Sequence, residues 1–83
     1  QLTINGNILS IKYGAFYCCK NLSKCLLNVN NCTISGESFF NCTSLTNFTF
    51  TGINFYTSFY SFMSCTSLKK LFINANDIDI GYR

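Results

Sequence analysis

The chain has 83 residues, of which 48% are hydrophobic, 17% aromatic and 11% charged, and its formal net charge is +3. This composition excludes a disordered segment and a coiled coil, and the weak positive charge favours solubility without indicating nucleic-acid binding. Polar residues interrupt every apolar stretch before it reaches the roughly 18 residues of a membrane-spanning helix, which excludes such a helix.

An internal repeat organises the whole chain. One set of residues recurring at an interval of 23 positions is Phe16, Phe39 and Phe62. A second set at the same interval is Leu2, Cys25, Phe48 and Leu71. A constant interval of this length is the signature of a solenoid, in which each repeat forms one coil. We therefore expect residues 1–83 to form a single segment of about 3.6 coils (83/23), as a fragment of a longer array.

The first coil opens where apolar Leu2 and Ile4 flank polar Thr3, which is the alternation of a strand. Equivalent triplets in successive coils should stack about 4.8 Å apart as a parallel sheet. Asparagine and glycine residues come after this strand and predict a bend. A second short strand should come next, anchored by Leu9 and Ile11.

The coil closes over residues 14–21, where Phe16 and Cys19 are three positions apart. This spacing fits one turn of α-helix or 3₁₀ helix. The same elements then recur in the later coils. The predicted fold is a right-handed solenoid of the α/β class, mostly β, with a parallel sheet on one face and short strands and one-turn helices on the other.

These residues resemble a known family over the whole chain. The leucine-rich-repeat core pattern is similar to the run Leu22-x-x-Cys25-x-Leu27-x-x-Asn30-x-Cys32. The signature of the BspA-like subclass, also called the Treponema pallidum type, resembles Ala15-Phe16-x-x-Cys19-x-x-Leu22. The sequence departs from the pattern at Cys25 and Cys32, where aliphatic residues are usual, at Ile53 in an asparagine column, and at Thr57 in an isoleucine column.

Six cysteines in a chain of this length ordinarily indicate a disulfide-stapled secreted domain. The repeat favours another interpretation for one column, which contains Cys19, Cys42 and Cys65. These three are predicted to be small buried core residues. A bridge between Cys25 and Cys32, which face the core of one coil, stays an open alternative. Cys18 aligns with polar residues and is expected at the surface.

The sequence offers little for catalysis or metal binding. It has no histidine and no Cys-x-x-Cys pair, so we expect neither a metal site nor a cofactor. The carboxylates Glu37, Asp77 and Asp79 are expected far apart, on turns of different coils, which argues against an enzyme. The four glycosylation sequons, at Asn21, Asn31, Asn41 and Asn47, exceed the roughly two that chance predicts, which is a weak signal that does not decide the compartment.

The candidate binding surface is the outer side of the first strand in each coil. It consists of Lys24, Leu26, Asn28, Asn47, Thr49, Thr51, Lys70, Phe72 and Asn74. Solenoids bind their partners on extended faces of this kind. The alternative is that these residues only favour sheet formation.

The resemblance implies the function. BspA-like repeats are common in surface proteins of bacteria and parasitic protists, where they are associated with adhesion. A surface-exposed protein-binding or adhesion module is therefore expected at the cell surface or outside the cell, with a host cell-surface or matrix protein as its partner.

Two other functions remain open. One is an intracellular scaffold or assembly protein in the cytoplasm, and the other is a disulfide-rich secreted effector. Self-association is also expected, because both ends of the solenoid would leave apolar side chains uncovered. These side chains are Leu2, Ile4, Leu71, Ile73, Ile78 and Ile80.

Overall fold

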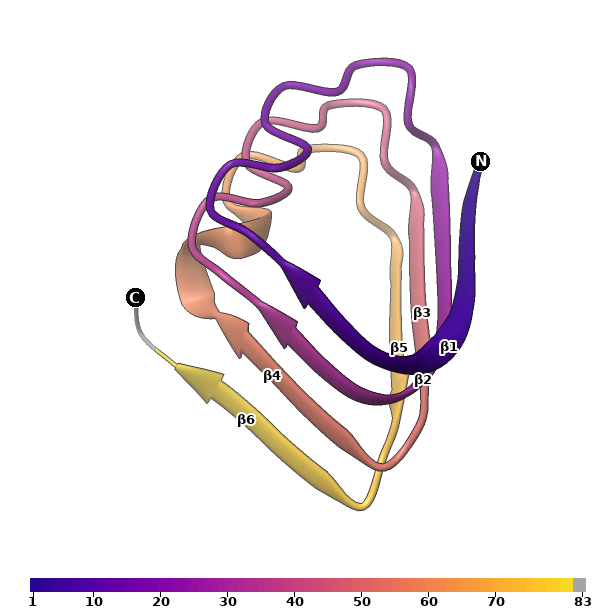
Figure 1. Ribbon diagram of the computed structural model, residues 1–83. Helices are drawn as coiled ribbons and strands as arrows, with labels where there is room; N and C mark the ends of the chain where they lie inside the picture. The colour runs from indigo at the N-terminus through magenta and orange to yellow at the C-terminus, as the bar shows by residue number, and fades with distance from the viewer. Residues whose placement is uncertain (82–83) are drawn as a thin grey trace.

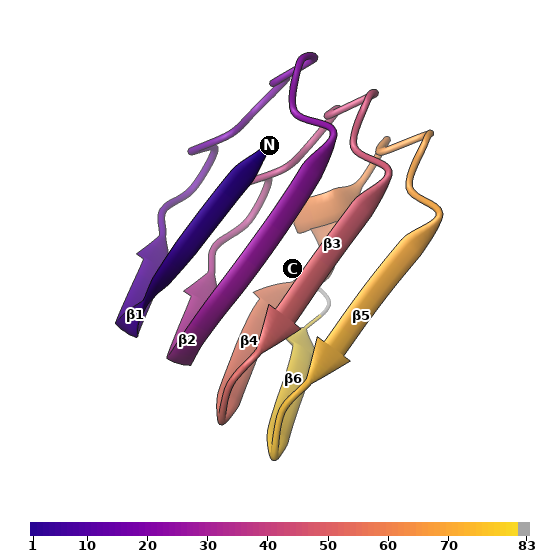
Figure 2. The same cartoon turned by 90° about the vertical axis from the view of Figure 1, so that its right-hand side faces the viewer.

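The computed structural model describes residues 1–81 as a solenoid of stacked coils (Figure 1). Its elements in chain order are β1 (Leu2–Ile11), β2 (Lys24–Ile34), β3 (Asn47–Thr51), β4 (Asn54–Ser58), the 3₁₀ helix η1 (Phe59–Phe62), β5 (Lys70–Asn74) and β6 (Asp77–Gly81). In Figure 1 the chain runs clockwise as it recedes from the viewer, and Figure 2 shows the successive coils side by side. The solenoid is therefore right-handed, as predicted.

All strand pairs are parallel, and they cover two sides of the solenoid. The first face consists of residues 2–6 and 24–28 together with β3 and β5, and the second face consists of residues 8–11 and 31–34 together with β4 and β6. Strands β1 and β2 bend between the two faces and contribute to both (Figure 1).

The register of the ladders is the predicted one. The recurring set that begins at Leu2 pairs as Leu2↔Cys25, Cys25↔Phe48 and Phe48↔Leu71. The second face repeats this arrangement, with Leu9 paired to Cys32 and Ile11 to Ile34. Both predicted strands of the coil are confirmed, and the interval of 23 residues is the step from one coil to the next.

The core lies between the two faces and includes four buried phenylalanine rings among aliphatic residues and cysteines. Alternation along the strands turns Phe48 and Phe50 inward from the first face and Phe55 inward from the second, and all three are buried. The ring of Phe48 meets that of Phe62 edge to face, with centroids 4.8 Å apart and planes at 72°. Such pairs contribute about 0.5–1.5 kcal/mol beyond the burial of their area.

A stack of phenylalanine rings closes the coils on the turn side, which is the side formed by residues 12–23 and their equivalents between the second face of one coil and the first face of the next. Phe16 and Phe39 lie 5.2 Å apart at an interplanar angle of 12°, and Phe39 and Phe62 lie 5.3 Å apart at 1°. These separations are close to the strand spacing of about 4.8 Å, so one phenylalanine per coil is sufficient to build a continuous stack. The backbone N–H groups of Phe16 and Phe39 donate to the carbonyls of Ser38 and Ser61, both at 2.8 Å.

The expected helical turn takes a different form in the first two coils. Only η1 is helical among residues 1–81, whereas residues 14–19 form two successive turns, closed by hydrogen bonds from Tyr17 N to Gly14 O and from Cys19 N to Phe16 O. Gly14 and Cys18 are left-handed in the first coil and Glu37 and Asn41 in the second, with φ of 67°, 57°, 56° and 62°, whereas in the third coil Ser64, with φ of 64°, is the one such residue among those described. A left-handed residue interrupts a right-handed helix, so the helix stays short or does not form.

The corner between the two faces changes at Gly52. Strand β2 runs through this corner without a break, but the third coil splits there into β3 and β4. A Cβ at Gly52 would collide with the carbonyl oxygen of Val29 in the preceding coil, and it would lie 2.7 Å from Cζ of Phe50. The corner of the third coil therefore accepts only glycine.

Replacing Gly52 by alanine should destabilise the chain strongly. The added methyl group displaces backbone as well as a buried ring, so we expect a loss on the order of 3 kcal/mol in the free energy of unfolding. The matched control is Gly6→Ala, because a Cβ at this equivalent position of the first coil would meet only Cγ1 of Val29, at 4.0 Å. Thermal melts of the two variants should differ by at least about 10 °C, and equal melting temperatures would contradict the steric argument.

The last coil leaves apolar side chains in solvent. Leu71, Ile78 and Ile80 are 47%, 50% and 51% exposed, although their counterparts in the second coil are buried. An apolar hollow of about 290 Å³ opens beside them and is lined by Thr57, Ser58, Phe62, Met63, Leu71, Ile73 and Ile80. Exposed strands with apolar inward residues are prone to pair with other chains.

The 83-residue chain should therefore associate through this end. We expect its sedimentation coefficient to rise with concentration, and the double variant Leu71→Lys, Ile80→Lys to remove this dependence, since lysine on an exposed edge strand opposes pairing. Ile8→Lys is the control, because Ile8 is 74% exposed on the outer side of β1. A monomer whose cooperative melt does not depend on concentration would refute the prediction.

Candidate functional site

All the residues of the predicted binding surface lie together on the outer side of the first face. The register places them in three rows, which are Lys24↔Asn47↔Lys70, Leu26↔Thr49↔Phe72 and Asn28↔Thr51↔Asn74. Neighbouring residues within one row are about 4.8 Å apart, which is the spacing between strands, and alternate residues along one strand are about 7 Å apart. The candidate site is thus a regular grid held by backbone hydrogen bonds.

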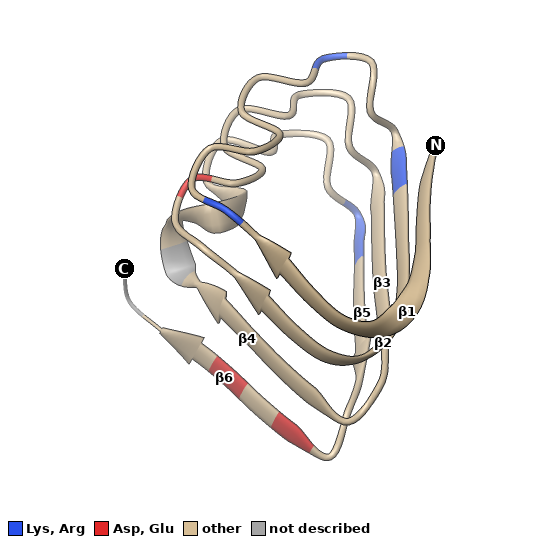
Figure 3. Cartoon of the chain, in the orientation of Figure 1, with Lys and Arg blue, Asp and Glu red and all other residues tan. Residues whose placement is uncertain are grey.

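The grid combines one exposed aromatic ring with separated positive charges. Phe72 is 52% exposed on the edge strand β5, while Thr49 beside it and Leu26 at the far end of the same row are half-buried. Lys24 and Lys70 mark the beginning of β2 and β5 in Figure 3, with uncharged Asn47 between them. The surface therefore offers apolar contact at one edge and positive charge along one row.

Asparagine ladders between coils accompany the backbone pairing. The amide nitrogen of Asn28 donates to Oδ1 of Asn5 at 2.9 Å, and that of Asn30 donates to Oδ1 of Asn7 at 2.8 Å. Each such bond contributes about 0.5–1.5 kcal/mol. Asn28, one of the predicted site residues, therefore also has a structural role. The sequence signal for these bonds was the repetition of asparagine at the coil interval.

The cysteine column packs in or against the core, but of its three predicted core residues only Cys42 is buried, while Cys19 and Cys65 are half-buried. Cys42 is fully buried, and its Sγ donates to the carbonyl of Phe16 at 3.1 Å. Cys65 repeats this contact one coil later with the carbonyl of Phe39, at 3.0 Å. A thiol is small and apolar enough for the core yet still satisfies a carbonyl group, which accounts for cysteine at this position.

All six cysteines are free thiols, including the pair for which a bridge was open. Burial raises the pKa of Cys25 to about 12 and that of Cys32 to about 11, because the thiolate would lose its hydration. Cys18 was expected to be exposed and is instead half-covered. The cause is the stacked left-handed turn, which places the amide nitrogen of Asn41 3.4 Å from its Sγ.

The expected separation of the carboxylates is wrong for two of them. Asp77 and Asp79 lie on one strand, β6, and not on turns of different coils. Alternate residues of a strand face the same way, so both point outward from the second face. Asp77 begins a strand because it continues the ladder of Asn54. Glu37 lies apart from them, in the turn after β2.

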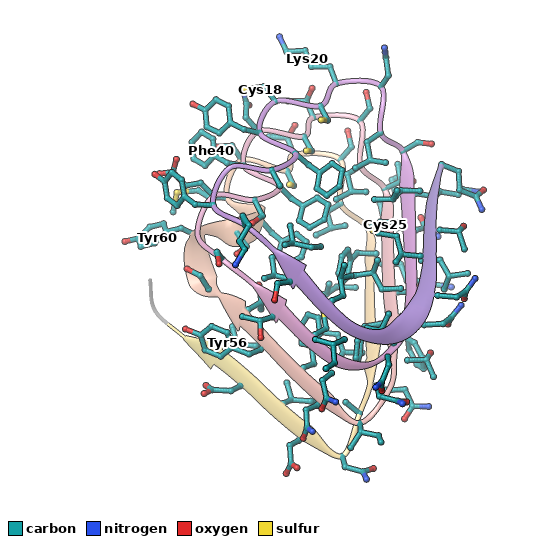
Figure 4. All side chains as sticks on the ribbon, in the orientation of Figure 1. Cys18, Lys20, Cys25, Phe40, Tyr56 and Tyr60 are labelled. Carbon is teal, nitrogen blue, oxygen red and sulfur yellow. The ribbon has the colours of Figure 1, made fainter. Side chains whose placement is uncertain are left out.

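A second surface was missed from the sequence. Exposed aromatic residues line the turn side of the solenoid, including Tyr13, Tyr17 and Tyr60, which are 70%, 50% and 42% exposed. The ring of Tyr17 stacks on that of Phe40 with centroids 5.3 Å apart, and Figure 4 shows Phe40 and Tyr60 pointing away from the core. The available signal was the recurrence of large side chains next to the buried phenylalanine column.

Two classes of feature do not occur within residues 1–81. Cysteine and carboxylate side chains form no cluster of three or more that would suit a metal ion. No helical segment in this part of the chain has both the length and the hydrophobicity needed to cross a bilayer.

The raised thiol pKa values predict selective alkylation. At pH 8 the thiolate fraction of Cys25 and Cys32 is lower than that of an ordinary cysteine by about a hundredfold or more, so iodoacetamide should modify Cys18 well before either of them. The folded state keeps the Cys25 thiol protonated to higher pH than the unfolded state does. The free energy of unfolding therefore falls as the pH rises from the ordinary thiol pKa of 9.0 toward the folded-state pKa of about 12. Mass spectrometry of the alkylated protein checks the order. Fewer than six reactive thiols in unreduced, denatured protein would reveal a disulfide.

A comparison with protein families agrees with this architecture. The model of the "BspA type Leucine rich repeat region (6 copies)" matches residues 1–83, which is the whole chain. Searches of curated proteins and of solved structures produced no match. Leucine-rich repeats of this kind are used for protein interaction, are generally not catalytic and are typically associated with surfaces. The chain belongs to the BspA-type leucine-rich-repeat family.

Proposed function

We propose that this chain is a surface-exposed, non-catalytic adhesion module that binds a protein through the grid on its first face. The observation that carries the proposal is the regular register of the nine outward side chains, with Phe72 52% exposed at one edge. An exposed aromatic ring beside short polar side chains is typical of protein-binding surfaces.

The rigidity of the grid supports this function. Its strands are held on both sides by backbone ladders, except at the outer edge of β5, so little backbone freedom is lost on binding. Lys24 and Lys70 give the face a positive row that would attract an acidic partner and raise the association rate.

A host cell-surface or matrix protein is the partner we propose, because surface association is typical of the family. The competing function is a cytoplasmic scaffold that uses the same face. Locating the protein on intact cells with an antibody, before and after permeabilisation, separates the two. We further propose that residues 1–83 are one stretch of a longer array, whose neighbouring coils cover the apolar ends.

Phe72→Ala should weaken binding to immobilised extracellular-matrix proteins without unfolding the chain. Truncating an aromatic anchor costs about 2 kcal/mol or more, on the order of a thirtyfold loss of affinity. Lys70→Ala should mainly slow association and reduce its dependence on salt. Surface plasmon resonance measures both effects.

Two control variants locate the binding surface. Lys20→Ala changes an exposed charge on the turn side, and Tyr17→Ala removes part of the exposed aromatic surface there. Both should bind as the unchanged chain does. If Tyr17→Ala abolished binding while Phe72→Ala had no effect, the function would belong to the turn side, and the grid would only be a structural face.

A further inference from the structure

The second face carries a shallow depression that the proposed adhesion surface does not use. Its volume is about 410 Å³, within the range of about 300–1,000 Å³ that small-molecule sites occupy. Its outward side chains form two rows across β2, β4 and β6, which are Asn31↔Asn54↔Asp77 and Thr33↔Tyr56↔Asp79. The depression therefore lies on the side of the solenoid away from Lys24 and Lys70.

The polar groups of the depression include both donors and acceptors. Asn54 donates its amide nitrogen to Oδ1 of Asn31 at 2.6 Å, which orients the two amides. The amide nitrogen of Asn31 and Oδ1 of Asn54 are then left to face a ligand, as donor and acceptor respectively. Asp77 and Asp79 add two exposed carboxylates that accept only, and within residues 1–81 neither has an ion-pair partner.

Tyr56 supplies an apolar surface beside these groups. It is 38% exposed, and Figure 4 shows it on the outer side of β4. Its hydroxyl oxygen lies 3.2 Å from the place where a Cβ of Gly81 would stand. The absence of a side chain at Gly81 thus gives the phenol ring room to lie across β6, next to Asp79.

We propose that this depression binds a neutral carbohydrate. One sugar ring packs its C–H groups against the negative face of the Tyr56 ring. Its hydroxyls donate to the carboxylates of Asp77 and Asp79 in charge-assisted hydrogen bonds, and they accept from the amide of Asn31. The contact needs no covalent step and no metal.

The mixture of groups favours a sugar over a basic peptide. The ammonium of lysine and the guanidinium of arginine have donors only, so a basic side chain would engage the carboxylates and leave the Asn31 amide donors unused. A hydroxyl donates and accepts at once, and several of them on one ring match a surface on which the carboxylates of β6 lie beside the amides of β2 and β4.

The test is a titration of the ¹⁵N-labelled 83-residue chain with lactose, maltose, cellobiose and diacetylchitobiose, followed by amide chemical shifts. We expect at least one disaccharide to shift the amides of β4 and β6, with a dissociation constant in the range of about 1–10 mM. Tyr56→Ala and Asp79→Ala should each weaken this binding about tenfold or more, while Tyr56→Phe keeps the ring and most of the affinity.

Phe72→Ala is the control, because it lies on the other face and should leave sugar binding unchanged. Unaltered amide shifts outside the second face verify that each variant is folded. The proposal is overturned if no disaccharide shifts these amides at about 20 mM, if the shifts lie elsewhere, or if Tyr56→Ala binds as well as the unchanged chain. Shifts caused by trilysine and by no sugar would overturn it in favour of a basic partner. Failure of this test leaves the adhesion proposal on the first face untouched.

Discussion

The structure depends on one constraint, which is that each coil has the same length as the one before it. Equal length brings residue i directly over residue i − 23, so backbone groups, rings and amides meet their own equivalents. The parallel ladders satisfy the backbone of both faces, and the phenylalanine stack and the asparagine ladders result from the same register. A slip of one residue would turn the apolar side chains of a strand outward, which opposes such a change of register.

This constraint also accounts for the unusual composition. Residues that would indicate chemistry in another fold have packing roles here, as the thiols of Cys42 and Cys65 show by bonding to carbonyls of the preceding coil. Aromatic residues are abundant because four large rings, Phe39, Phe48, Phe50 and Phe55, fill much of the core between the two faces.

The sequence predicted most of the fold because periodicity is independent of local propensity. The column from Leu2 to Leu71 and the rows around Phe72 were both read correctly from the interval alone. The left-handed turns at Cys18 and Asn41 were not predicted, since neither residue requires φ > 0 and the geometry is imposed by the stacking. The position of Asp77 and Asp79 on the same strand was missed, because an acidic segment that follows asparagine residues has the composition of a turn.

The depression on the second face could not have been predicted either. It depends on how far the ring of Tyr56 extends over Gly81, which is a matter of side-chain direction and not of spacing. The same holds for the exposed aromatic residues of the turn side, because spacing alone does not show whether a large side chain points toward the core or away from it.

Burial is unequal along the solenoid, and this inequality determines how the molecule would come apart. Leu27 and Ile34 in the second coil are fully buried, whereas Ile78 and Ile80 at the end are half exposed. Because each coil contacts only its neighbours, the free energy of opening rises from β6 toward the second coil. Under tension applied at the carboxyl end, the strands would detach one coil at a time, and each release would lengthen the chain by a constant increment while the remaining coils stay folded.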